Sequence, residues 1–304
     1  MHYDYLIGGV KIRIRSTVPI GAGERWKSFA SAFDEPDHEY ILAFSDTLPR
    51  LAAEKEARGE FVHCALVDNR PFRTYLKSNG SAYATVFERS SQCWEISLLR
   101  GLLPWGSEVE QLFPLMGLSR VLLRHNRLLL HGAYVESAYG GILFTAPSGT
   151  GKTTQAELWR RHRDARIING DRAVLSLADD SAVIHGFVHS GSSPDCLNME
   201  FPLFAVIALS QGKDNQLLTL SGKDAIRALM RSAYLLPEFK EDLPSLMFMA
   251  DKLCSRVPLL YLSCLPDVSA VEILDRMFHD IMNKSQKISA QSIYSTEGGR
   301  GVSL

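Results

Sequence analysis

The sequence predicts an α/β protein with a smaller, β-rich N-terminal domain and a larger domain whose central sheet is flanked by helices. Two observations support this fold class. Short apolar runs separated by turn residues dominate the first hundred positions, a pattern typical of strands. After residue 107, strand-like and helix-like segments alternate, and an apolar strand runs through a glycine-rich turn into a helix-forming segment at 141–161.

The bulk composition narrows the classes of partner. The 304 residues are 46% hydrophobic and 22% charged, with a net charge of -1, so neither nucleic acid nor an anionic membrane is an expected partner. No apolar run approaches the length of a membrane span, and the N-terminus lacks a secretory pattern. The five cysteines show no paired spacing. We therefore expect a soluble, cytoplasmic protein.

The β-rich region is assigned to residues 1–107. Partial alternation over 3–15 predicts two strands around the Gly8-Gly9 turn. Pro104, Gly106 and Ser107 cluster before an amphipathic pattern at 108–124, which predicts a single helix. Further strands of this region are expected at 40–44, 61–67, 82–87 and 94–99.

The larger domain is assigned to residues 108–284. A hairpin is expected from 173–177 and 182–188 around Asp179-Asp180, which we interpret as turn formers. The polar, glycine-containing segment 285–304 is expected to be a flexible tail. Other strands are expected at 128–134, 141–145, 166–169, 203–209 and 258–264, and helices at 155–161, 221–235, 243–253 and 269–282.

Residues 146–154 read Ala-Pro-Ser-Gly-Thr-Gly-Lys-Thr-Thr, a Walker A phosphate-binding loop (P-loop) in which Ala146 replaces the first glycine. Backbone N–H groups of such a loop surround a polyphosphate, and the helix that follows adds a favourable dipole. Lys152 reaches the outer phosphates and the Thr153 hydroxyl ligates Mg²⁺. ATP is the expected nucleotide, with GTP left open. The expected nucleotide contacts are Ser148, Gly149, Thr150, Gly151, Lys152, Thr153 and Thr154.

Two further motifs surround the loop. His131-Gly132 lies on the strand before it, and Gly170-Asp171-Arg172 ends a buried strand after it. Over 128–178 this order resembles the HPr kinase/phosphorylase family, and more closely its compact kinase-like relatives, some of which phosphorylate peptides during natural-product tailoring. The resemblance continues weakly to about residue 235. It implies a P-loop kinase core of HPr kinase type, and the family's hexamers favour a homo-oligomer.

The resemblance also implies roles for individual residues. Lys152 would stabilise the transferred phosphoryl group, Thr153 would hold magnesium, and His131 would be the active-site histidine. Asp171 corresponds to the second member of an acidic pair, whose first member, the expected base, is Gly170 here. Asp171 would then act as base, metal ligand or both, unless Glu136 replaces the missing acid. This departure argues against the reverse, phosphorylase activity.

Besides Glu136, three residues are weaker candidates for contacts with the substrate. Arg172 follows Asp171, Ser192 lies in the loop 189–195, which is rich in serine and glycine, and Asn198 matches the relatives' pattern. The basic run 160–163 is interpreted as a complement to the dipole at the end of the loop helix.

Three hypotheses follow. The first is an ATP-dependent kinase that phosphorylates a hydroxyl, serine above all, of a peptide or small protein such as a natural-product precursor. The second is a kinase for a small metabolite, an amino acid or polyol, which requires a closed pocket with convergent polar groups. The third is a nucleotide-binding module that recognises a partner without turnover.

Overall fold

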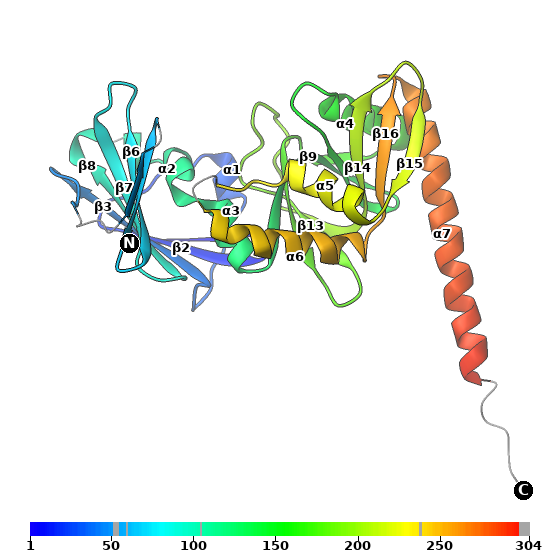
Figure 1. The fold of residues 1–304 in the computed structure, drawn as a ribbon, viewed down its shortest axis with the longest axis horizontal. Helices are drawn as coiled ribbons and strands as arrows, with labels where there is room; N and C mark the ends of the chain where they lie inside the picture. The colour runs from blue at the N-terminus through cyan, green and yellow to red at the C-terminus, as the bar shows by residue number, and fades with distance from the viewer. Residues whose placement is uncertain (51–54, 59, 104, 237–238, 298–304) are drawn as a thin grey trace, which may run out of the picture.

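The computed structural model describes residues 1–50, 55–58, 60–103, 105–236 and 239–297. Within them the chain forms two eight-stranded sheets and several helices, and the two sheets occupy opposite ends of the body (Figure 1). The expected mixed α/β class is confirmed. The division into domains at residue 107 stays a prediction.

The first sheet has the strand order β1-β2-β3-β8-β7-β6-β5-β4. The expected hairpin turns at Gly8 and Gly9, whose φ angles of 59° and 77° favour glycine. The sequence patterns missed β4, β6 and the short helix α1 (Glu24–Lys27). The strands are β1 (His2–Ile7), β2 (Val10–Ser16), β3 (His38–Ser45), β4 (Lys55–Arg58), β5 (Val62–Val67), β6 (Arg70–Leu76), β7 (Ala82–Glu88) and β8 (Cys93–Leu99).

The single helix predicted over 108–124 is wrong: two helices, α2 (Val109–Met116) and α3 (Leu118–Arg124), replace it. Gly117 separates them with φ 55° and ψ 39°, a left-handed conformation that ends a helix. A Cβ at Gly117 would lie 2.9 Å from the Trp94 ring, so this site also needs the smallest residue. The buried apolar side chains of both helices share one hydrophobic cluster with the first sheet, except Leu123, which packs in a cluster with the second.

The second sheet has the order β10-β9-β12-β13-β14-β16-β15, with β11 paired to β9. Its strands β10, β14 and β16 are parallel neighbours. The predicted β12–β13 hairpin is confirmed, and Ala178 N donates to Ser181 O across its turn. The bounds are β9 (Arg127–Ser137), β10 (Gly140–Thr145), β11 (Arg166–Asn169), β12 (Arg172–Leu177), β13 (Ala182–His185), β14 (Glu200–Gln211), β15 (Gln216–Leu220) and β16 (Leu259–Cys264).

Helices cover both faces of the second sheet. On one face, α4 (Lys152–Arg163) and α7 (Val268–Glu297) bury Trp159 and Phe278 against Phe144. On the other, α5 (Gly222–Ser232) and α6 (Leu243–Cys254) bury Leu229 and Met249. Short 3-10 turns lie at Arg100–Leu102, Trp105–Ser107 and Lys240–Asp242.

Helix α7 begins against the second sheet and runs past the predicted end of the larger domain, so that its C-terminal part projects away from the other elements (Figure 1). The predicted tail 285–304 therefore overlaps a helix as far as Glu297, and 298–304 lie outside the described residues. Among the described helices, none combines the length and apolar character needed to cross a membrane.

Candidate active site

The phosphate loop links the end of β10 to the start of α4. Gly149 and Gly151 have φ angles of 76° and 113°, which side-chain-bearing residues rarely adopt. A Cβ at either position would meet no heavy atom within 4 Å. The glycines are therefore required by the backbone conformation and not by lack of space. This conformation leads the chain into α4, whose first N–H groups have no partner within the helix.

Lys152 lies at the first position of α4 and is 7% exposed. Its Nζ donates to the carbonyl oxygens of Ala146 (2.9 Å) and Pro147 (3.2 Å). Burial lowers the pKa of Lys152, and the nearby Asp171 carboxylate partly offsets this. The lysine thus lies across its own loop, where phosphate oxygens can replace the two carbonyls as acceptors.

A cavity of about 500 Å³ adjoins the loop. It brings together most of the residues that the sequence selects, and Thr150 lies instead in a neighbouring cavity of about 380 Å³ with Gln211 and Pro266. The larger cavity is lined by His131, Ser148, Gly149, Gly151, Lys152, Thr153, Thr154, Glu157, Arg160, Gly170, Asp171, Ser190, Ser192, Ser193, Pro194 and Asp195.

Strand register explains why distant motifs meet here. Strand β9 pairs with β10 on one side and with β12 on the other. Thr145, the last residue before the loop, lies opposite Gly132, and Arg172 lies opposite His131. Gly132 N also donates to Asp171 O (2.9 Å). The loop, the histidine and the Gly-Asp-Arg motif therefore lie at one edge of the sheet.

Asp171 is held by two cationic or protonatable neighbours. Its Oδ1 lies 3.2 Å from His131 Nδ1, and its Oδ2 lies 3.1 Å from Arg172 Nε. The hydrogen bond with His131 lowers the pKa of Asp171, Arg172 lowers it further, and burial opposes both. Tyr234 completes the group, with its hydroxyl 2.8 Å from Arg172 Nε and 3.3 Å from His131 Nδ1.

This arrangement distinguishes the two nitrogens of the His131 ring. Nδ1 faces Asp171 and Tyr234, and within the described residues Nε2 has no hydrogen-bonding partner in the protein. With the ring proton on Nδ1, Nε2 is an acceptor, and His131 lines the cavity. Asp171 therefore orients an imidazole whose second nitrogen is available to a substrate.

Gly170 stands where the resemblance expects the first acid. A Cβ at Gly170 would lie 2.2 Å from Ser193 Oγ and 2.4 Å from Ser193 Cβ. The Ser193 backbone is anchored on both sides, since its N–H donates to Ser190 O (3.0 Å) and Arg25 NH2 donates to its carbonyl (2.7 Å). The space of the missing side chain is thus filled by the loop 190–195.

The structure places Glu136 away from the cavity, against the expectation that it replaces the missing acid. It pairs with Arg166 (2.8 Å) and lies five residues beyond His131 on β9. That separation is about 16 Å along a strand, with the two side chains on opposite faces. The cavity lining does not include Glu136.

Two other substrate candidates also lie outside the lining. Asn198 Nδ2 donates to Ser28 O (3.0 Å), which links the loop region to the N-terminal part of the chain. Arg172 is not in the lining; it pairs with Asp171, which is, and its guanidinium lies over the rings of Phe113 and Tyr234. Ser192 does line the cavity.

Sequence reasoning missed Glu157 and Arg160 in this lining, whereas Asp195 belongs to the loop 189–195 that the sequence selects together with Ser192. Arg160 was interpreted only as a complement to the helix dipole, whereas it pairs with Glu157 beside the cavity. The spacing of Thr153, Glu157 and Arg160 contains the signal, because residues three and four apart share one helix face.

The residues present fit a magnesium ion held jointly with a nucleotide. Thr153 and Asp171 line the same cavity, and hydroxyl and carboxylate oxygens are ligands that Mg²⁺ accepts together with phosphates and water. In the described part of the chain, no group of three His, Cys, Asp or Glu side chains is placed to hold a metal alone.

Comparisons with known proteins give a distant structural similarity. Neither a family model nor a curated protein matches it. Among solved structures, it is similar to the HPr(Ser) kinase/phosphatase from Coxiella burnetii, with 10% identity and a TM-score of 0.33 over 55% of this chain and 97% of that chain. That protein bears the name of the family that the motifs resemble. At this TM-score the likeness supports no argument about the site.

Proposed function

We propose that this protein is an ATP-dependent kinase that transfers the γ-phosphoryl group to a hydroxyl, preferentially of serine, in a peptide or small protein. One observation carries the proposal: a single cavity joins the phosphate loop and Lys152 to a His131–Asp171 pair. Phosphoryl transfer requires positioning and charge neutralisation more than covalent chemistry. The loop and Lys152 meet these demands on the phosphate side.

On the side of the acceptor hydroxyl, His131 is the proposed general base. His131 Nε2 takes the proton of the acceptor hydroxyl while its oxygen bonds to the γ-phosphorus, and the bond to the bridging oxygen breaks to release ADP. Asp171 positions the imidazole and balances the positive charge that forms on it. With both carboxylate oxygens engaged and its pKa lowered, Asp171 is the weaker base.

Magnesium held by Thr153 and Asp171 would supply charge neutralisation between the phosphates. The chain's own residues have separate tasks. Loop amides fix the phosphates, and Lys152 exchanges the Ala146 and Pro147 carbonyls for phosphate oxygens. Arg172 and Tyr234 keep Asp171 and His131 in place.

The rim of the cavity favours an acceptor that belongs to a larger molecule. Four of the lining residues, Ser148, Thr153, Thr154 and Ser192, are exposed, so the cavity opens to solvent there. A metabolite kinase is expected to enclose its substrate, so we place the small-metabolite kinase second. The nucleotide-binding module without turnover is the third hypothesis, and the substitution at Gly170 is its main support.

The test is transfer of label from γ-labelled ATP. The purified protein is incubated with magnesium, serine-containing peptides, their alanine analogues, and free serine or polyols. We expect label on serine peptides, none on alanine analogues, and none with Lys152→Ala, whereas Lys223→Ala on the exposed face of α5 keeps activity. Label on free serine or a polyol alone supports the metabolite kinase. Bound ATP that stays intact with every acceptor refutes the kinase.

A further inference from the structure

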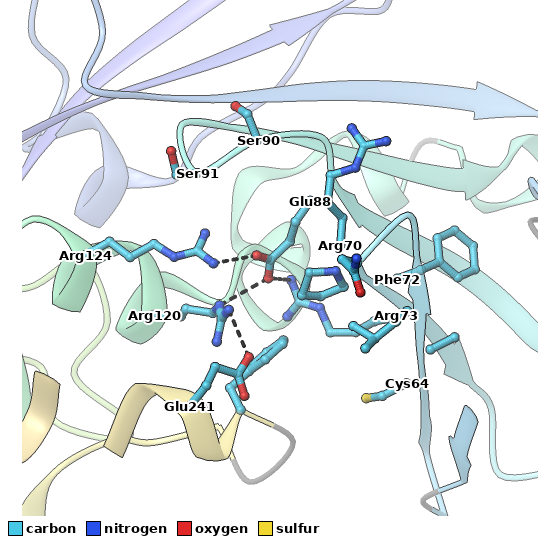
Figure 2. A pocket seen from close by; sticks show the side chains of 15 residues that line it. Cys64, Arg70, Phe72, Arg73, Glu88, Ser90, Ser91, Arg120, Arg124 and Glu241 are labelled. Carbon is cyan, nitrogen blue, oxygen red and sulfur yellow. Dashed lines mark hydrogen bonds and ion pairs between the residues drawn. The ribbon is translucent and has the colours of Figure 1, made fainter. Parts of the chain in front are cut away.

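A second cavity, of about 670 Å³, lies between the first sheet and helix α3. None of its lining residues lines the cavity at the phosphate loop, and it plays no part in the proposed phosphoryl transfer. Strands β5, β6 and β7, helix α3 and the segment 239–241 contribute side chains (Figure 2). Residues from well-separated parts of the chain are thus gathered around one hollow.

Three arginines converge on one buried carboxylate in this cavity (Figure 2). Glu88, at the end of β7, is 2% exposed. Its oxygens lie 2.7 Å from Arg124 NH2, 3.3 Å from Arg120 Nε and 3.8 Å from Arg73 NH2. One negative charge therefore faces three positive ones.

Arg120 is shared with two further carboxylates. Its NH1 lies 2.7 Å from Asp242, whose side chain is 13% exposed, and its NH2 lies 3.1 Å from Glu241, whose side chain is 59% exposed. Of these carboxylates, Glu241 is the one with room to leave the arginine for water. An exposed ion pair of this kind contributes only about 0–1 kcal/mol.

Donors remain available for another anion. The Arg124 side chain is 27% exposed, and it donates to Glu88 through one of the five N–H groups of a guanidinium. Within the described residues, Arg73 Nε and NH2 are buried without a hydrogen-bonding partner, although Arg73 NH1 donates to Tyr75. The cluster thus has more donor capacity than its own carboxylates use.

The rest of the wall has an apolar part, formed by Leu66, Pro71, Phe72 and Phe239, and a polar part that comprises Asn69, Arg70, Ser90 and Ser91. The Phe239 ring lies under the Arg120 guanidinium, 3.8 Å from its centroid, and the Arg73 guanidinium lies 5.2 Å from the same centroid. Arginine on an aromatic face is a common geometry for holding a cation in place. A ligand bound in this cavity would contact guanidinium groups that are held in place next to an apolar surface.

We propose that this cavity binds a ligand that carries a carboxylate next to an apolar group. The carboxylate replaces Glu241 on Arg120 and bonds to Arg124, while the apolar part lies against Phe72 and Phe239. Arginine forks bind carboxylates and phosphates. A carboxylate restores the charge that the departing Glu241 removes, whereas a phosphate dianion adds a further negative charge to the cavity. Free organic acids and acidic peptides both present this chemistry.

Titration calorimetry on the full chain tests the proposal. The probes are 3-phenylpropionate, its neutral amide, the peptide acetyl-Phe-Glu-Leu-amide, its glutamine analogue and inorganic phosphate. We expect at least one of the two carboxylate probes to bind more tightly than its neutral counterpart and than phosphate. If the free acid binds more tightly than the peptide, the source is a small molecule, and the reverse order indicates a peptide segment.

Two variants act in opposite directions. Arg124→Gln weakens binding of the carboxylate probe about tenfold, because a charge-assisted hydrogen bond is lost. Glu241→Gln tightens it up to about fivefold, since the competing internal carboxylate is gone. Arg100→Gln, at an exposed ion pair with Asp46 outside this cavity, is the control and leaves binding unchanged.

Each opposite outcome overturns the proposal. These are no binding by either carboxylate probe, equal binding of the neutral counterparts, tighter binding of phosphate, or no gain with Glu241→Gln. Thermal unfolding of each variant shows whether it is folded. Should Arg124→Gln unfold, Glu241→Gln still decides, because its exposed side chain contributes little to the fold and a purely structural role predicts no gain in affinity.

Discussion

Replacing Gly170 with alanine tests whether the loop 190–195 fills the place of the missing acid. The new Cβ would lie 2.2 Å from Ser193 Oγ and 2.4 Å from Ser193 Cβ, both far inside van der Waals contact. Rotating the Ser193 hydroxyl does not relieve the second contact, so the backbone must move. That backbone is held by Ser190 and Arg25. We therefore expect Gly170→Ala to lower the free energy of unfolding by about 1–3 kcal/mol.

A double-mutant cycle isolates the contact. Ser193→Gly removes both clashing atoms and leaves Ser193 Cα, at 3.9 Å, as the nearest recorded neighbour of the new Cβ. In this background Gly170→Ala should be tolerated, with a coupling free energy of about 1–2 kcal/mol between the two sites. The measurement is urea unfolding of the four proteins at one pH. An unchanged stability of Gly170→Ala, or additive effects in the double variant, would refute the packing argument.

Four further predictions concern the site. Lys152→Ala should lower phosphoryl transfer by about 10²-fold or more, because the transition-state charge loses its main protein partner; steady-state rates beside Lys223→Ala check this. Asp171→Asn should reduce turnover much more than nucleotide affinity, and equal losses in calorimetry and kinetics would show that Asp171 only holds magnesium and does not position His131. The lowered pKa of Asp171 also sets a pH dependence. The contribution of the Asp171 carboxylate to the free energy of unfolding is complete above about pH 4, the ordinary pKa range of an unfolded aspartate, and is lost as the pH falls through the lower pKa of the folded state. In urea titrations, the difference in unfolding free energy between wild type and Asp171→Asn should therefore shrink as the pH falls through this range. A difference that grows contradicts the lowered pKa. Glu136→Gln should leave transfer within about twofold of wild type, since its partner is Arg166, and a large loss would show that the acid acts at the site.

Features that depend on a few neighbouring residues were predictable. The phosphate loop is one, because Gly149 and Gly151 supply positive φ angles and Lys152 and Thr153 follow at fixed positions. Most of the strands and helices are further examples, since apolar periodicity reports which face of an element is buried, although β4, β6, β15 and α1 were missed. Gly117 shows the limit of that reasoning. The amphipathic pattern continues through it, but its left-handed conformation and the neighbouring Trp94 ring divide the helix.

The meeting of side chains from distant segments was decided by the tertiary structure. Strand register places His131 opposite Arg172 and carries Glu136 to the far end of β9, and no local pattern encodes that choice. The same holds for Ser193 against Gly170 and for the arginines around Glu88. Local sequence determined the phosphate cradle because backbone dihedrals depend on adjacent residues. Tertiary packing alone decided which charged side chains face the phosphate loop, because their positions depend on how separate strands and loops align.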